Sequence, residues 1–222
     1  MGGKMRKAIK GILLTVVALM LAGCVSSRGF KIDVPQGTIA KPNGMQVFIR
    51  QITDNRDFQL RPSSPNIPSF GSKRDIGNAS IKCRTVGRQR NGYGKAMRNV
   101  FLDENQKIET VIYDALKNSL NALGYEVVDS RALAKNDAII MDVSIDRFWS
   151  WINIGAWTLR MDAEIKTTLT LGSTGKQLMV IAESQNHCQT GSSANWRKTI
   201  RISIENYIQE AQEQLRCLPD NC

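Results

Sequence analysis

Apolar and polar residues alternate along three stretches in the second half of the chain. The clearest is 157–171, and 138–149 and 177–188 follow the same period of two. Such alternation predicts strands with one buried face and one wet face. Residues 172–175 (Gly-Ser-Thr-Gly) are typical of a hairpin turn, so the strands on either side of them are expected to pair.

Shorter strands are predicted in the first half. Residues 45–53 form an apolar run that ends at the polar, turn-like cluster 54–57, and 79–86 and 125–128 are compatible with short strands. The segment 57–100 contains three prolines and several glycines, which favour a long loop.

Two helices are predicted from apolar residues that recur at helical spacing. The first follows Asp103, whose spacing to Gln106 resembles a capping box, and Gly124 supplies its stop signal. The second spans about 193–215, with Trp196 and Tyr207 on its apolar stripe.

Two helices with one apolar face each can cover one side of a sheet. The predicted fold is therefore α+β: a two-layer sandwich, with a mostly antiparallel sheet and two amphipathic helices on one face. Residues 44–216 are predicted to form a single domain with a long basic loop at about 57–100. Residues 217–222 are predicted to form a cysteine-containing tail.

The first 23 residues have the layout of a secretory signal peptide. Four basic residues precede the apolar run 12–22, which is shorter than the ~20 residues of a spanning helix. The run ends in Leu-Ala-Gly followed by Cys24, which resembles the bacterial lipobox. By that resemblance Cys24 carries fatty chains, and 24–43 form a lipidated tether. A plain signal peptide followed by a chance cysteine is the alternative.

Removal of residues 1–23 lowers the formal net charge from +10 to +6, because that segment holds four basic and no acidic residues. The remaining excess lies between Arg50 and Arg98. A patch there is expected to face phosphate-bearing lipid headgroups or an acidic protein, and a solvated loop is the alternative. Nucleic acid is not an expected partner in the cell envelope. The candidate interaction residues are Arg74, Lys82, Arg84, Arg88, Arg90 and Lys95.

Four cysteines follow Cys24, and an even number in an oxidising compartment predicts disulfides. They are Cys83, Cys188, Cys217 and Cys222. Three connectivities are possible, of which we expect Cys217–Cys222 and Cys83–Cys188. A metal site is the rival interpretation, but the chain has no C-x-x-C motif and His187 is its only histidine, so no metal is predicted.

The sequence contains no arrangement typical of an enzyme. His187 and Cys188 are neighbours that point to opposite faces of a predicted strand, so they cannot form a dyad. Residues 172–176 resemble a phosphate-binding loop only superficially, because position 170 is not glycine and position 177 is neither serine nor threonine. The chain is therefore predicted to be non-enzymatic and to use no cofactor.

Three tryptophans of one parity, Trp149, Trp151 and Trp157, fall within ten residues. They are candidates for an aromatic edge that meets a membrane interface or a protein. The alternative is that the helices cover them as core, since the alternation places Trp149 on the face of Val143 and Ile145.

Several short motifs resemble one family of envelope proteins. A Val-Phe-Ile strand (47–49) runs into Asp-Asn-Arg (54–56), 86–94 reads Val-Gly-Arg-Gln-Arg-Asn-Gly-Tyr-Gly, and the first helix ends in Leu-Gly-Tyr-Glu-Val (123–127). With the lipobox and the order of elements, this resembles the YajG-like group of outer-membrane lipoproteins over most of the mature chain. The resemblance implies a periplasmic α+β module without catalytic residues to carry over. The four cysteines after Cys24 depart from it.

The predicted function is a lipid-anchored interaction or assembly module of the bacterial envelope, held in the outer membrane and facing the periplasm. Val25 and Ser26 lack the aspartate that retains lipoproteins in the inner membrane in enterobacterial-type sorting. The expected working surface is the basic loop 73–98 with the open edge of the sheet, which can accept a partner strand from another envelope protein. A carrier of lipid between helices and sheet is the main alternative, and a cell-wall enzyme is a third. The sequence defines neither the partner nor the oligomeric state.

Overall fold

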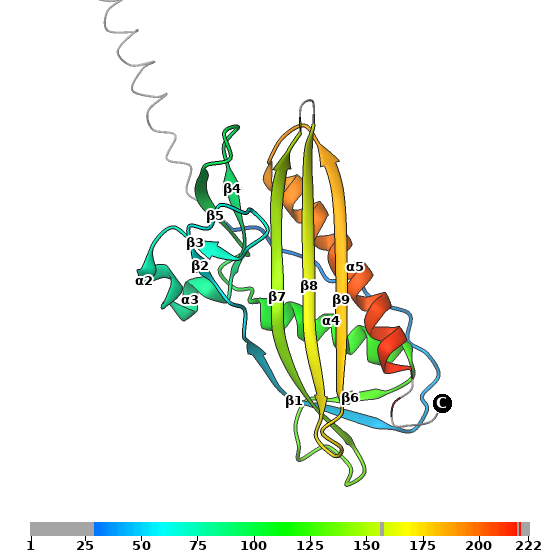
Figure 1. Ribbon diagram of the computed structural model, residues 1–222. Coiled ribbons are helices and arrows are strands. Elements are labelled where there is room, and N and C mark those ends of the chain that lie inside the picture. Colours follow the sequence, from blue (N-terminus) through cyan, green and yellow to red (C-terminus); the bar gives the residue numbers. More distant parts are fainter. Residues whose placement is uncertain (1–28, 156–157, 217, 219–222) are drawn as a thin grey trace, which may run out of the picture.

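A mixed seven-stranded sheet carries two long helices in the computed structural model, which describes residues 29–155, 158–216 and 218 (Figure 1). Strands of this sheet are β1 (Gln46–Asp54), β4 (Thr85–Arg90), β5 (Ala96–Phe101), β6 (Glu126–Val128), β7 (Ile139–Ile154), β8 (Leu159–Leu171) and β9 (Gln177–Cys188). The long helices are α4 (Ile108–Ala122) and α5 (Ser193–Leu215). A separate pair, β2 (Gln59–Leu60) and β3 (Ser69–Phe70), and two single-turn helices, α2 (Lys73–Ile76) and α3 (Ala79–Lys82), complete the described chain.

The prediction of an α+β fold is confirmed, but the prediction of a mostly antiparallel sheet is wrong. Strand β1 runs parallel to both β6 and β7, and β4 runs parallel to β7. The pairs β4–β5, β7–β8 and β8–β9 are antiparallel. Alternation in a sequence shows which face of a strand is buried, but not which distant strand pairs with it. The parallel pairs here join strands separated by long crossovers, each of which includes α4.

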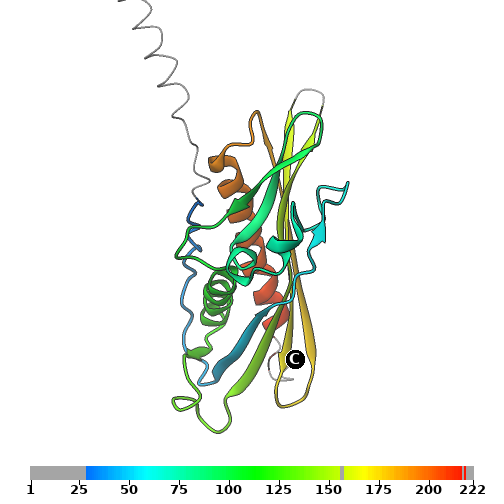
Figure 2. The same cartoon turned by 90° about the vertical axis from the view of Figure 1, so that its left-hand side faces the viewer.

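The two long helices lie on the same side of the sheet (Figure 2). Helix α5 packs on β8 and β9, and α4 packs on β1 and β6. Both contribute to one core, together with inward residues such as Val143, Ile165 and Val180. Two hydrogen bonds join the sheet to α5, from Ser184 Oγ to the Thr199 carbonyl and between the Thr167 and Tyr207 hydroxyls, and a third joins the helices, from Ser119 Oγ to the Ile208 carbonyl.

The predicted capping box of the first helix is wrong. Helix α4 begins at Ile108 after Lys107, which makes no side-chain cap hydrogen bond. The Gln106 side chain instead binds the backbone N–H and carbonyl of Ile32, at 2.9 and 2.7 Å. The predicted stop is confirmed, because α4 ends at Ala122 and Gly124 adopts a φ of +84°.

Residues 30–43, assigned to the tether in the sequence analysis, are part of the folded domain. Phe30 and Ile32 are buried in the core, and Phe30 forms a bridge with Leu102. Further along, the Pro35 carbonyl accepts a hydrogen bond from the Asn118 side chain of α4. The predicted tether, 24–43, therefore overlaps the folded domain from Phe30 onward. Residues 1–28, 219–222 and Cys217, which include the predicted signal peptide and most of the predicted tail, lie outside the described residues.

The predicted long loop at 57–100 is largely ordered structure. It contains β2, β3, α2 and α3, and β4 and β5 form a hairpin that joins the main sheet. The predicted short strand at 79–86 is also wrong at its start, where the Asn78 side chain caps α3 by accepting hydrogen bonds from Ser80 and Ile81.

Candidate functional site

The sheet face opposite α4 and α5, here called the outer face, carries two of the predicted site residues, Trp149 and Trp151. Residues 57–72, here called the flap, lie on this face and include the short β2–β3 pair. The far edge of the same face is β9, the last strand of the sheet.

Trp149 lies beneath the flap and is only 1% exposed, so its predicted role in an interaction surface is wrong. Its ring meets Phe58 edge-on at 5.9 Å, and Phe58 stacks on Phe70 at 4.7 Å. The indole N–H donates to the Pro65 carbonyl at 3.1 Å. This small second core holds the flap on the sheet.

A β-bulge explains why Trp149 faces the flap and not the helices. The register between β7 and β8 shifts between Ile145 and Arg147, which changes the parity of every later residue of β7. Ile145 and Phe148 therefore both join the core under the helices, and Trp149 turns to the outer face.

Trp151 lies next to Trp149 on the outer face, half-buried beside a cleft of about 480 Å³. The cleft is polar, and Asp162 in its wall binds the Asn153 amide and the Arg160 guanidinium. The third tryptophan, Trp157, lies outside the described residues. The predicted three-tryptophan edge is thus reduced to Trp151 in the described chain. The cleft is lined by Asn66, Trp151, Arg160, Asp162, Ala163, Glu164, Glu183, Ser184 and Gln185.

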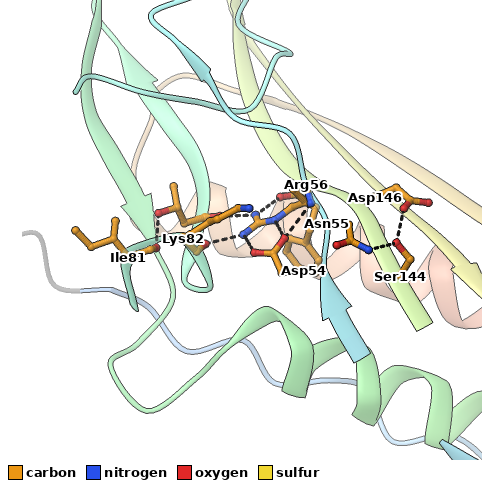
Figure 3. A network of polar contacts seen from close by, with 9 residues as sticks. Asp54, Asn55, Arg56, Ile81, Lys82, Ser144 and Asp146 are labelled. Atoms are coloured by element: carbon orange, nitrogen blue, oxygen red, sulfur yellow. Dashed lines mark hydrogen bonds and ion pairs between the residues drawn. The ribbon is translucent and has the colours of Figure 1, made fainter. Parts of the chain in front are cut away.

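Arg56 holds the inner end of the flap to the sheet and was not identified from the sequence (Figure 3). Its guanidinium is buried and forms a bidentate pair with Asp54, at 2.8 and 3.0 Å. The remaining N–H groups donate to the carbonyls of Lys82 and Thr85, both at 2.6 Å, and of Phe148 at 2.9 Å. All five N–H donors of the side chain are thereby used. One residue so connects β1, the α3–β4 turn and β7.

Asn55, next to Arg56, begins a second polar chain that runs across the outer face (Figure 3). Its amide donates to Ser144 Oγ at 2.9 Å, and Ser144 donates to Asp146 at 2.7 Å. Thr168 of β8 donates to the other carboxylate oxygen of Asp146 at 2.6 Å. These contacts fix the two strands below the flap.

Most of the predicted basic patch serves the domain's own structure. Arg84 donates to the carbonyls of Leu102 and Asp103, and the Lys82 ammonium lies 5.5 Å from the centre of the Phe58 ring. Arg90 donates to four backbone carbonyls of the flap and the β4–β5 turn. Arg88 is buried. Only Arg74 and Lys95 of the six are exposed, so the prediction of one solvent-facing basic surface is wrong.

The edge strand β9 is the most accessible candidate surface. It pairs with β8 over its whole length, from Thr170↔Gln177 to Leu159↔Cys188, and with no other described strand. Val180 and Ala182 pack in the core, whereas Met179 and Ile181 project to the outer face with 49% and 43% of their surface exposed.

The predicted disulfide between Cys83 and Cys188 is not formed. Both are free cysteines, and both are half-buried. Cys83 ends α3, where burial, more than the charge of Glu109, raises the pKa of its thiol. Cys188 ends β9 opposite Leu159, so the two thiols belong to different elements. Cys24, Cys217 and Cys222 lie outside the described residues.

The described residues offer no group of three or more histidine, cysteine or acidic side chains that could hold a metal ion. His187 is exposed on β9, 3.3 Å from the Gln185 amide. Within the described ranges, no helix is long and apolar enough to cross a membrane.

No family model and no curated protein matches the chain. Solved structures that align with it include an uncharacterized protein, with 9% identity and a TM-score of 0.41 over 84% of this chain and 95% of that one. A Xanthomonas campestris protein from a family of unknown function has 10% identity and a TM-score of 0.39, over 83% and 94%. A homologue of a neuraminyllactose-binding hemagglutinin, from Helicobacter pylori, has 8% identity and a TM-score of 0.43, over 83% and 91%. These likenesses assign neither family nor ligand, and membership of the YajG-like group stays a prediction.

Proposed function

We propose that this protein is a lipid-anchored docking module of the bacterial cell envelope, which binds an extended segment of another envelope protein along β9. The observation that carries the docking function is the outer edge of β9, which pairs with no strand among the described residues. The lipobox at Cys24 and the resemblance to YajG-like lipoproteins support the location in the outer membrane, facing the periplasm.

The edge of β9 lacks the lysines, prolines and bulges that protect many edge strands from pairing with other chains. Strand β9 contains no lysine, arginine, proline or glycine, and its register with β8 has no shift. Its one charged residue is Glu183, whose carbonyl accepts a hydrogen bond from Asn206 of α5 at 2.7 Å. A long, flat and partly apolar edge of this kind fits strand addition by a partner.

The side chains beside the edge define the chemistry of the partner segment. Met179 and Ile181 are exposed neighbours on the outer face, next to Thr168 and Lys166 of β8. A segment that pairs with β9 and places alternate apolar side chains on this face covers both. Backbone hydrogen bonds then supply affinity, and the apolar pair supplies register.

The alternative of a lipid carrier receives less support from the core. A carrier needs an apolar cavity between helices and sheet, but that layer is filled by fully buried side chains such as Leu116, Ile204 and Leu169. Hydrogen bonds from Tyr207 to Thr167 and from Ser184 to the backbone of α5 also hold this helix directly on the sheet.

Crosslinking in intact bacteria tests the docking edge. A photoreactive phenylalanine analogue replaces Ile181 in the full-length chain, and the matched control replaces Leu133, which is 68% exposed on the loop before β7. We expect one discrete protein adduct from position 181 that disappears when Met179→Lys is added, and none from position 133. A synthetic peptide covering the crosslinked segment should slow amide hydrogen exchange in 177–188. Equal adducts from both positions, no adduct, or an adduct between two copies of this chain would each reject the proposal.

The anchor is tested separately with Cys24→Ala. Two or three acyl chains hold a protein durably, at ~0.8 kcal/mol per buried methylene. The variant should keep the folded domain but leave the membrane fraction, and membrane retention of a processed, unlipidated chain would reject the anchor.

A further inference from the structure

Three arginines gather where the flap meets β4, and a single carboxylate, that of Asp75 in α2, acts on Arg88 among them. Arg61 belongs to the flap, and Arg88 and Arg90 belong to β4. Gly71 joins the first two, because its carbonyl accepts from Arg61 Nε at 2.7 Å, and a Cβ at Gly71 would lie 2.7 Å from Arg88 Nη2. None of the three forms an ion pair with any residue that the structure describes.

Arg88 is the exceptional member of this cluster. Only 8% of its surface is exposed, and its Nε and Nη1 atoms are buried without a hydrogen-bond partner among the described residues. Buried polar groups are nearly always paired, and a buried charge without a partner is strongly unfavourable. Arg56, which is 1% exposed, shows the usual solution, with every N–H donor used.

The two neighbours hold their positions through the backbone of the flap. Arg90 donates to the carbonyls of Pro62, Ser63 and Ser64, which follow Arg61 directly. Arg61 adopts a φ of +50°, the only described residue other than glycine with a positive φ. Such strain is maintained only where the surroundings require it.

The direction of the pKa shift of Arg88 also indicates a buried guanidinium close to other positive charges. Burial, followed by the charges of Arg90 and Arg61, lowers the pKa of Arg88, and Asp75 of α2 acts in the opposite direction. One carboxylate against three guanidinium groups leaves an excess of positive charge around the buried Arg88.

We propose that Arg88, with Arg61 and Arg90, forms a binding site for a phosphate-type anion beneath the end of the flap. The planar fork of a guanidinium matches the oxygens of phosphate, and an oxyanion would satisfy the Arg88 donors that the protein leaves unpaired. The excess of charge favours a phosphate over a singly charged carboxylate. Because Gly71 lies against the guanidinium, the anion reaches Arg88 when the flap shifts. This site is separate from β9 and does not depend on docking there.

Thermal unfolding and calorimetric titration with inorganic phosphate test the site, on the full chain in non-ionic detergent at constant ionic strength. We expect phosphate, but not chloride, to raise the unfolding temperature. Arg88→Met should weaken phosphate binding by about 10- to 100-fold, as expected for a lost charge-assisted hydrogen-bonding group. Without phosphate, the same variant should unfold at a higher temperature than the wild type, because a buried unpaired charge is removed.

Arg98→Gln is the matched control. It removes one positive charge from β5, where Arg98 is exposed and binds Gln89, and it should leave phosphate binding unchanged. Arg61→Gln, on the exposed flap, gives a second test should Arg88→Met fail to fold, and it should also weaken binding. Absence of phosphate binding by the wild type in every arm, or equal losses in the Arg88 and Arg98 variants, would overturn the site.

The source of the phosphate is distinguished in the same preparation. Micelles containing phosphatidylglycerol are compared with micelles containing phosphatidylcholine, each with and without inorganic phosphate. Arg88-dependent binding of phosphatidylglycerol that free phosphate does not displace identifies a lipid headgroup, and binding of free phosphate alone identifies a soluble phosphate.

Discussion

Replacing Arg56 by methionine removes the group that joins β1, the α3–β4 turn and β7. The variant keeps the apolar stem but leaves the Asp54 carboxylate and the carbonyls of Lys82, Thr85 and Phe148 without their donor. Arg56 is 1% exposed, so water cannot replace these contacts without opening the structure.

The expected loss follows from the burial of the pair. Removing one partner of a buried ion pair destabilises a protein by about 3–5 kcal/mol, because the other charge stays buried and unpaired. In a domain of this size, that corresponds to a fall in unfolding temperature of about 6–20 °C. Arg56→Lys keeps the charge but has three donors in place of five, so its loss should be intermediate.

Urea and thermal unfolding, followed by circular dichroism, measure this effect. Arg50→Met is the matched control, because Arg50 of β1 forms an ion pair with Asp142 of β7 but is exposed, and such pairs contribute little. The double variant Asp54→Leu with Arg56→Met should recover part of the loss. An Arg56→Met protein that unfolds within about 2 °C of the Arg50→Met control, a shift worth less than 1 kcal/mol, would refute the reasoning.

Three further predictions follow from single contacts. Trp149→Ala should destabilise the domain by about 3–5 kcal/mol and increase proteolysis of the flap, whereas Trp149→Phe should do so less. Burial, then the hydrogen bond to Asp129, raises the pKa of Tyr113 to about 12 from its ordinary value of 10. The neutral hydroxyl therefore stabilises the fold below pH 10, and this contribution should disappear between pH 10 and 12 and be absent in Tyr113→Phe. Gln106→Ala removes both hydrogen bonds to Ile32 and should speed amide exchange in 30–43; unchanged exchange would show that burial of Ile32 alone fixes this segment.

The sequence correctly predicted those elements that have one face packed in the core and the opposite face exposed to solvent. Strand β9 and helix α5 have the expected bounds, 177–188 and 193–215, because in each one side packs on a partner and the other stays wet. The hairpin turn at 172–175 is also confirmed.

The failures lie where structure depends on distant contacts. The parallel pairing of β1 with β7 joins Val47 to Ile139, and no local pattern encodes that register. A single bulge after Ile145 changed the face on which Trp149 lies. Gln106 could act as a capping residue or bind Ile32, and only the position of the N-terminal segment decides between them.

The candidate site shows the same division. Arg56 stood within a predicted turn, and its Asp54 partner two residues earlier was the only local signal of a buried pair. The basic residues at 84–90 were predicted to form part of an interaction surface, but a count of charges could not separate Arg84 and Arg90, which bind backbone carbonyls, from Arg88, whose Nε and Nη1 have no partner among the described residues. The place of β9 at the edge of the sheet follows from the order of strands, which alternation does not reveal.

The proposed docking function depends most on the lipid anchor, because confinement to a membrane surface raises the effective concentration of the domain near envelope partners. Intact-mass analysis of the protein purified from its own membrane measures this directly. We predict a mature chain that begins at Cys24 and carries the added mass of a diacylglycerol and an amide-linked acyl chain. An unmodified N-terminus, or a chain cut elsewhere than before Cys24, would contradict the proposed function.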